Sequence, residues 1–262
     1  MHGTDTSGTT TSTPDTSGVG KPGAGTPGPI VAISAHAADF VWRAGGALAL
    51  AAADGRGAHV VCLSYGERGE SARLWRQGLA LDEVKAVRRA EAERAAAAIG
   101  ARITFLDAGD YPLRATDELT DAVVQILRAD QPSAVLTHSA SDPYNGDHPA
   151  AAALALEARV LAQAAGYPSP HPTLGAPPVF RFEPHQPEMC GFMPDVLLDI
   201  TPVFERKRQA MECMQAQEHL WTYYTELALR RGTQAVRNGG AKAIRHAEAY
   251  QRVYPRVTAV LP

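Results

Sequence analysis

Short apolar runs alternate with longer amphipathic segments along most of this chain. The runs have the length of buried strands and occupy residues 30–34, 58–64, 102–109 and 133–138. After each run, small and apolar residues recur at helical spacing, over residues 39–55, 81–100, 116–130 and 148–166. This order of strands and helices predicts an α/β fold in which helices cover both faces of a mostly parallel sheet.

The last third of the chain is less regular. A proline-rich segment covers residues 175–188, and a short apolar run follows at residues 195–201. Helical spacing returns at residues 204–238, for which we expect one long helix.

Earlier in the chain, Thr116 stands where its hydroxyl can cap the helix that follows it.

The first 29 residues are mostly Gly, Ser, Thr and Pro, without the apolar core of a signal peptide. We expect a disordered tail at residues 1–29 and one catalytic domain at residues 30–262, because a chain with 45% hydrophobic residues can bury a large core. Charged or turn residues interrupt every apolar run before the ~18 residues that a membrane-spanning helix needs. We therefore expect no membrane partner.

The charge balance and the cysteines narrow the class of protein further. The 25 basic and 28 acidic residues give a net charge of -3, which offers no basic surface for nucleic acid or lipid, so small molecules are the expected partners. Cys62, Cys190 and Cys213 are too widely spaced for a disulfide framework. A reducing cytoplasm is the expected location.

Residues with metal-binding chemistry follow two of the predicted strands. In open sheets of this kind, ligands bind beyond the carboxyl ends of the strands. His36 and Asp39 follow the first strand and His148 follows the fourth, so the three could converge on one cation with a position left open. A simpler interpretation of the first pair is that Asp39 caps a helix and His36 bonds a loop carbonyl.

Other candidates have ordinary structural explanations. His138 competes with His148 as the third ligand, but its place at the end of a strand favours a buried supporting histidine. His185 lies between prolines that stiffen its loop, where it could act as a catalytic acid or pair with Glu183 or Glu188. Glu67 or Glu70 could reach a water at the metal, although loop carboxylates are usually only solvated.

Four motifs together resemble the PIG-L/LmbE family of zinc-dependent N-acetylglucosaminyl deacetylases. They read AHAAD, SYGERGE, RRAEAERAAAAIG and DPYNGDHP, and the likeness spans residues 30–262. It implies a Rossmann-like three-layer sandwich and a zinc site. In the family, the first motif is His-Pro-Asp-Asp, whose first Asp is the general base. A later His-Pro-Asp-His motif supplies the third ligand through its second His. Mapped onto this chain, the base position is Ala38 and the third-ligand position is Ala151, so His148 would have to bind instead.

The missing base argues against amide hydrolysis, which must deliver a proton to a leaving amine. Adding water to a carbon–carbon double bond has no leaving amine. Longer matches, including SAHAADFVWRAGGALAL, GAPPVFRFEPHQPE and QEHLWTYYTELALRRGTQAVRN, resemble a hydratase branch of the same family, which acts on an unsaturated tricarboxylate in bacterial gallate and protocatechuate breakdown.

The resemblance to that branch implies specific roles for residues of this chain. Zn²⁺ would be held by His36, Asp39 and His148, Glu70 would act on the water, and His185 would be the acid. Fe²⁺ or Co²⁺ also suits such ligands. Carboxylate groups call for arginines, and the candidates in order of preference are Arg43, Arg88 and Arg68. Relatives imply a homo-oligomer. The alternatives are a deacetylase in which Glu70 replaces the lost base, and a metal-binding protein without catalytic activity.

Overall fold

Within the residues that the computed structural model describes, Met1 and 27–259, seven strands form one sheet. Its order is β3 (Arg102–Phe105), β2 (Ala58–Cys62), β1 (Ile30–Ser34), β4 (Ala134–Thr137), β5 (Val179–Phe182), β7 (Ala247–Arg252) and β6 (Val196–Asp199). The first five strands are parallel, and β7 pairs antiparallel with both β5 and β6. The expected mostly parallel sheet is confirmed. Most of the predicted tail, residues 2–26, lies outside the described residues.

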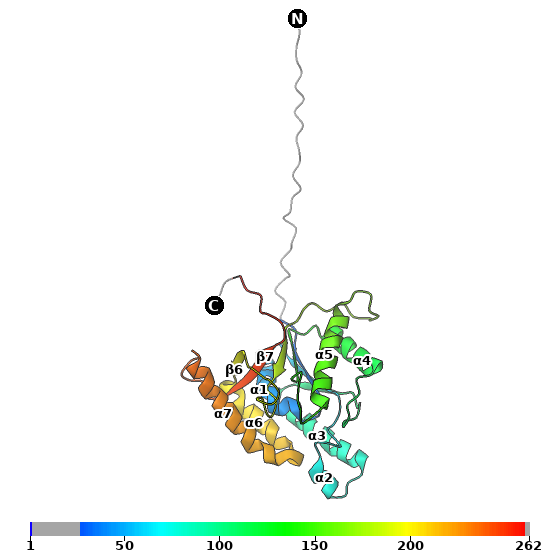
Figure 1. Ribbon diagram of the computed structural model, residues 1–262, viewed down its shortest axis with the longest axis vertical. Coiled ribbons are helices and arrows are strands. Elements are labelled where there is room, and N and C mark those ends of the chain that lie inside the picture. Colours follow the sequence, from blue (N-terminus) through cyan, green and yellow to red (C-terminus); the bar gives the residue numbers. More distant parts are fainter. Residues whose placement is uncertain (2–26, 260–262) are drawn as a thin grey trace.

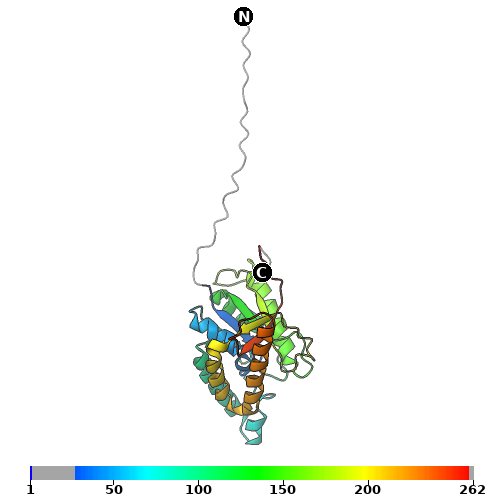
Figure 2. The ribbon, with the colours of Figure 1, turned by 90° about the vertical axis from the view of Figure 1, so that its left-hand side faces the viewer.

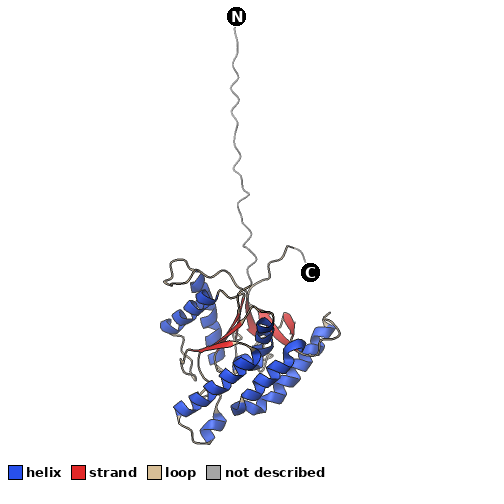
Figure 3. Ribbon diagram, turned by 180° about the vertical axis from the view of Figure 1, so that it is seen from behind, coloured by secondary structure: helices blue, strands red, loops and turns tan. Residues whose placement is uncertain are grey.

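Helices cover both faces of this sheet (Figures 1 and 3). One layer contains α1 (Asp39–Ala53), α3 (Leu81–Ile99), α6 (Phe204–Cys213) and α7 (Trp221–Arg237), and α7 is seen from its outer side in Figure 2. The other layer contains α4 (Asp117–Asp130) and α5 (Asp147–Gln163). The short helices α2 (Ala72–Arg76), η1 (Thr201–Val203) and η2 (Gln215–Leu220) lie in connections. Thr116 caps α4 as expected, since its hydroxyl accepts the Leu119 N–H at 3.2 Å.

The sheet separates two apolar cores, because successive side chains of a strand point to opposite faces. In β1, Ala32 packs with the α1 and α3 layer, while Val31 and Ile33 pack with the α4 and α5 layer. All three side chains are fully buried. Complete burial of a larger aliphatic side chain such as Val or Ile stabilises the fold by about 1.5–3 kcal/mol, so this alternation fixes which face of the sheet each residue of β1 packs against.

The expectation of one long helix over residues 204–238 is wrong. The chain leaves helical geometry between α6 and α7, where η2 contains Gln217 at φ -124° and ψ 34°. The backbone N–H of Ala216 in this break donates to Glu91 on α3 at 2.8 Å. A long-range contact therefore overrides the helical pattern. No helix in the described part of the chain is both long and apolar enough to cross a membrane.

Candidate metal centre and active site

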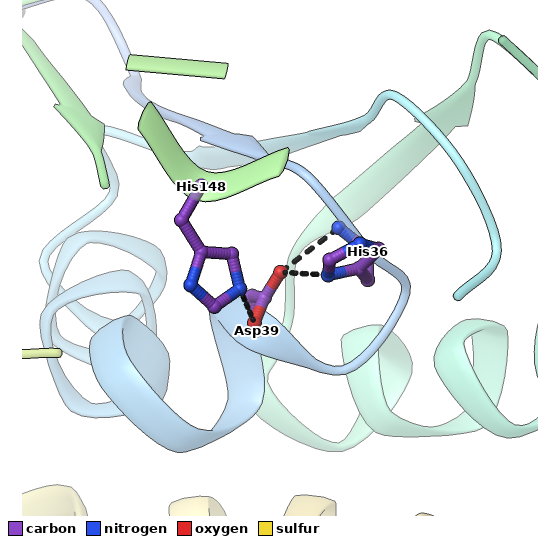
Figure 4. Close-up of side chains that lie close together, drawn as sticks. All are labelled: His36, Asp39 and His148. Atoms are coloured by element: carbon purple, nitrogen blue, oxygen red, sulfur yellow. Dashed lines mark hydrogen bonds and ion pairs between the residues drawn. The ribbon is translucent and has the colours of Figure 1, made fainter. Parts of the chain in front are cut away.

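Three side chains from two connections, the one after β1 and the one after β4, meet beyond the carboxyl ends of these strands (Figure 4). His36 follows β1, Asp39 begins α1, and His148 is the second residue of α5. One carboxylate oxygen of Asp39 lies 3.2 Å from Nδ1 of His36, and the other lies 3.5 Å from Nε2 of His148. All three residues are buried. They form a group whose ligand atoms could hold one metal ion.

The facing nitrogen atoms of this group suit a cation. His36 Nδ1 and His148 Nε2 are buried, and neither has a hydrogen-bond partner among the described residues. Buried polar atoms without partners are rare and costly in native proteins. Two imidazoles and one carboxylate are also a common donor set for a catalytic divalent metal with an open position. The chemistry of the donors therefore fits a metal centre.

Each of the two histidines is oriented by a second carboxylate. Asp147 lies 3.1 Å from His36 Nε2, and Asp142 lies 2.7 Å from His148 Nδ1. Such outer partners set the tautomer of a metal-binding histidine and leave its other nitrogen free. Neither Asp142 nor Asp147 was among the residues predicted from the sequence. Their place in DPYNGDHP, six and one positions before the predicted ligand His148, is the signal that could have identified them.

Hydrogen bonds keep Asp147 ionised. Burial raises its pKa, but the bond with His36 and the backbone N–H groups of Tyr111 and Leu113 outweigh burial and lower the pKa to about 2. These backbone groups lie 2.9 and 2.8 Å from the carboxylate oxygens. The carboxylate therefore joins His36 to the loop after β3.

His138 is unsuited to be the third ligand. Its Nε2 accepts the backbone N–H of Ala35 at 2.9 Å, so the nitrogen nearest Asp39 is already used. The ring stacks on His148 with centroids 4.3 Å apart. Burial, with the neighbouring His148, holds the pKa of His138 well below its usual range. This placement favours the supporting role that was the alternative to ligation.

Two positions that hold a base and a metal ligand in the family hold alanines here, and both are shut off from the cavity. Ala38 and Ala151 are fully buried, and neither lines the cavity beside the metal group. His148, three positions before Ala151, is the residue whose ring faces Asp39. A second possible group, His36 with Asp110 and Asp147, is less suited to a metal, because Asp110 already accepts the backbone N–H groups of Arg68 and Gly69.

A cavity of about 620 Å³ opens in front of the metal group. Its lining includes two of the candidate metal ligands, Asp39 and His148, and the candidate catalytic residues Glu70 and His185. It also includes several aromatic and basic side chains: Arg43, Arg73, Arg76, Tyr111, Tyr144, His219 and Tyr224. This volume is in the usual range for a small-molecule site. The structure thus brings Glu70, His185 and Arg43 together around one space.

Two glycines allow Glu70 to approach the metal group. Gly66 has φ +70°, and a Cβ there would lie 3.1 Å from the Cβ atoms of both His36 and Glu70. A Cβ on Gly69 would overlap the ring of Tyr111 at 1.9 Å. The loop therefore passes close to both neighbours only because these positions lack side chains. It places Glu70 Oε1 at 3.6 Å from His36 Nδ1.

Side-chain amides hold both oxygens of Glu70. Oε1 accepts from Asn145 at 3.2 Å, and Oε2 accepts from Gln217 at 2.7 Å. Glu67, the other glutamate of this loop, is fully buried and does not line the cavity. Of the two candidate glutamates, Glu70 alone is placed to act on a molecule in the cavity.

His185 lines the same cavity and is held by two tyrosines. Its carbonyl accepts the Tyr223 hydroxyl at 2.5 Å, and its Nδ1 lies 3.5 Å from the Tyr224 hydroxyl oxygen. Burial and the positive charge of Arg43 lower the pKa of His185. The ring is half-buried and can give a proton to a molecule in the cavity.

Only one of the three predicted substrate arginines lines the cavity. Arg43 has Asp39 at 3.6 Å as its ion pair, and its Nε has no hydrogen-bond partner among the described residues. Arg88 is fully buried between Glu91 and Gln217, and Arg68 donates to the carbonyl of Asp110. The expected substrate contacts of Arg88 and Arg68 are therefore not supported. Arg73 and Arg76, which were not predicted from the sequence, line the cavity instead.

Comparison with known proteins gives consistent matches. The profile of the PIG-L family, described as GlcNAc-PI de-N-acetylase, matches residues 31–159. The chain is 56% identical over 230 residues to a 4-oxalmesaconate hydratase of Pseudomonas putida, covering 86% of this chain and 89% of that protein.

Solved structures agree with these sequence matches. The 4-carboxy-2-hydroxymuconate hydratase GalB from Pseudomonas putida has a TM-score of 0.87 at 54% identity, covering 90% of this chain and 100% of that one. An N,N'-diacetylchitobiose deacetylase from Pyrococcus horikoshii has a TM-score of 0.70 at 22% identity, covering 86% and 83%. The deacetylase shares the fold.

Proposed function

The chain belongs to the PIG-L family, and we propose that it acts as a hydratase of that family. The reaction is addition of water to the carbon–carbon double bond of 4-oxalomesaconate, also called 4-carboxy-2-hydroxymuconate, to give 4-carboxy-4-hydroxy-2-oxoadipate. The observation that carries this proposal is the 56% identity to a 4-oxalmesaconate hydratase over 86% of the chain. The presence of both Glu70 and His185 in the lining of one cavity supports it.

We propose Zn²⁺ as the metal, held by His36, Asp39 and His148. Their two imidazoles and one carboxylate suit zinc, and also Fe²⁺ or Co²⁺. A bound divalent ion supplies Lewis acidity, which lowers the pKa of a coordinated water toward neutrality. Asp142 and Asp147 keep the two histidine rings in the orientation that this binding needs.

Glu70 and His185 divide the proton transfers. The carboxylate of Glu70 takes one proton from the attacking water, and the oxygen of that water forms a bond to one carbon of the double bond. His185 gives a proton to the neighbouring carbon, so the elements of one water are added and no group leaves. Each transfer by a positioned side chain is worth about 10²- to 10⁴-fold in rate.

Arg43 is the proposed contact for one substrate carboxylate. Its buried guanidinium faces the cavity, and such groups bind carboxylates through two parallel hydrogen bonds. Arg73 and Arg76 on α2 reach the same cavity from a more exposed position. Arg73 is paired with Glu218 at 3.1 Å, so Arg76 is the freer of the two to meet an outer carboxylate.

The experiment that tests this function is an absorbance assay with the conjugated tricarboxylate, run beside an assay for acetate release from N-acetylglucosaminides. Loss of the conjugated absorbance without acetate release is expected. Acetate release alone would indicate a deacetylase, and bound metal without either activity would indicate a non-catalytic protein.

We also propose that residues 30–262 act as one catalytic domain in a cytoplasmic homo-oligomer. The three cysteines are free thiols, as a reducing compartment would allow. Light scattering on the purified protein measures the oligomeric state, and a single mass equal to one chain would contradict this proposal.

A further inference from the structure

A chain of buried polar contacts runs from α3 to Glu70. Gln217 donates through Nε2 to Glu70 at 2.7 Å, and its Oε1 accepts from Arg88 Nη2 at 2.8 Å. Arg88 Nη1 in turn donates to Glu91 at 2.7 Å. Arg88, Glu91 and Gln217 are 0%, 2% and 6% exposed. None of these three residues takes part in the proposed proton transfers.

The chemistry of the donors fixes which way the Gln217 amide points. A guanidinium has donors only, so the amide oxygen must face Arg88 and the amide nitrogen must face Glu70. Asn145 is locked in the same manner, because its Oδ1 accepts the backbone N–H of Asp147 at 3.1 Å. Its nitrogen therefore also faces Glu70. Each oxygen of Glu70 therefore accepts one hydrogen bond, Oε1 from Asn145 and Oε2 from Gln217.

The ion pair between Arg88 and Glu91 also holds the chain segment that carries Gln217. Glu91 accepts from Arg88 through one oxygen and from the backbone N–H of Ala216 through the other, at 2.7 and 2.8 Å. Gln217 is the residue with non-helical φ and ψ in the break between α6 and α7. The pair thus fixes both the backbone beside Gln217 and the orientation of its amide.

We propose that Arg88 and Gln217 are positioning residues that hold the carboxylate of Glu70 in place for proton transfer from the attacking water. This inference rests on the proposed function. Glu70 is on a loop and reaches the cavity at the end of a flexible side chain, so its oxygens need fixed donors to stay beside His36. Arg88 supplies that constraint through Gln217, without contacting the substrate.

Double-mutant kinetics test the proposal. Gln217→Met keeps the side-chain volume and removes the donor, and kcat is expected to fall about 10- to 100-fold with KM changed less than about twofold. In the Glu70→Gln background the same change should lower the residual kcat by less than about twofold, because there is no carboxylate left to position. An unchanged kcat for Gln217→Met, or an equal loss in both backgrounds, would overturn the proposal.

Arg88→Met should reproduce the kcat loss of Gln217→Met. The matched control is Arg128→Met, because Arg128 is another buried arginine, which donates to the carbonyls of Ala162, Ala164 and Tyr167 away from the cavity. Both changes are expected to lower the melting temperature, but only Arg88→Met should lower kcat. If Arg128→Met lowered kcat equally, the effect would be one of stability, and the proposal would be wrong.

A crystal structure of Gln217→Met separates failure of this inference from failure of the proposed function. An inactive wild-type protein would remove the hydratase assignment, yet the network could still be tested by the position of Glu70. We expect its carboxylate to leave its wild-type position in the variant, because Oε2 loses its donor while only Asn145 still holds Oε1. A carboxylate unmoved from its wild-type position would show that Gln217 does not position it.

Discussion

Nε2 of His36 lies 3.1 Å from a carboxylate oxygen of Asp147, although the two residues are 111 positions apart in the sequence. This contact leaves Nδ1 as the atom of His36 that faces Asp39. The choice of nitrogen at the proposed metal centre is therefore made by a residue that is not itself a proposed ligand.

Asp147→Asn should weaken metal binding by about 10- to 100-fold, because loss of an outer carboxylate makes the histidine a poorer and less fixed ligand. Competition with a chromogenic chelator measures the affinity. Asp130→Asn is the matched control, since Asp130 pairs with His59 at 2.6 Å away from the metal group. Equal affinities for Asp147→Asn and the wild type would contradict the prediction.

His148→Ala should lose metal binding, whereas His138→Ala should retain one ion per chain. The reason is that His148 presents an unpartnered nitrogen to Asp39, while His138 uses its nearest nitrogen to accept a backbone N–H. Metal analysis after gel filtration distinguishes the two variants. Loss of the metal in His138→Ala but not in His148→Ala would show that His138 is the ligand and His148 the supporting residue.

Glu70→Gln should lower kcat by about 10²- to 10⁴-fold at unchanged metal content, because the amide cannot take a proton from water. The variant keeps the size of the side chain. Parallel measurement of turnover and bound metal checks both parts. Turnover near that of the wild type would remove Glu70 from the mechanism.

The apparent pKa of the alkaline limb of the pH profile of kcat/KM should be lower than the ordinary histidine pKa near 6.5. Burial and the charge of Arg43 lower the pKa of His185, so its acid form is lost as the pH rises through that lowered value. His185→Ala should remove this limb. Arg43→Gln should move it to higher pH, and a limb that stays in place would show that Arg43 does not act on His185.

Arg43→Gln should raise KM more than Arg76→Gln does. A hydrogen bond between a buried charged group and a carboxylate is worth about 1.5–3 kcal/mol, or roughly 10- to 100-fold, whereas an exposed ion pair is worth about 0.2–1 kcal/mol. Arg43 is buried and Arg76 is exposed. Steady-state kinetics with the tricarboxylate checks the order, and a larger effect at Arg76 would reverse the proposed contacts.

The alternating strands and helices up to residue 163 could be predicted because their periodicity is local. Strand β7 was missed for a physical reason. Its Glu248 is buried and binds Lys207 at 2.6 Å, so a polar residue stands where the pattern of a half-buried strand has an apolar one. The break between α6 and α7 was missed because Glu91, far away in the sequence, holds it.

The site was predictable where chemistry and strand order coincide. His36, Asp39 and His148 follow adjacent parallel strands, so their convergence follows from the order of the sheet. The arginines were harder to assign, because a guanidinium is directed by partners that lie far away in the sequence. Gln217 shows this for Arg88, and Asp110 shows it for Arg68.

The placement of β7 between β5 and β6 sets an order on assembly during synthesis. Strand β6 has no sheet neighbour other than β7 within the described residues, and the outer edge of β5 is also completed by β7. Ribosomes add roughly 5–20 residues each second, so both edges stay open for several seconds while α6 and α7 are made. Open edges invite pairing with other chains. The nascent protein therefore depends on β7 to close both edges and limit aggregation.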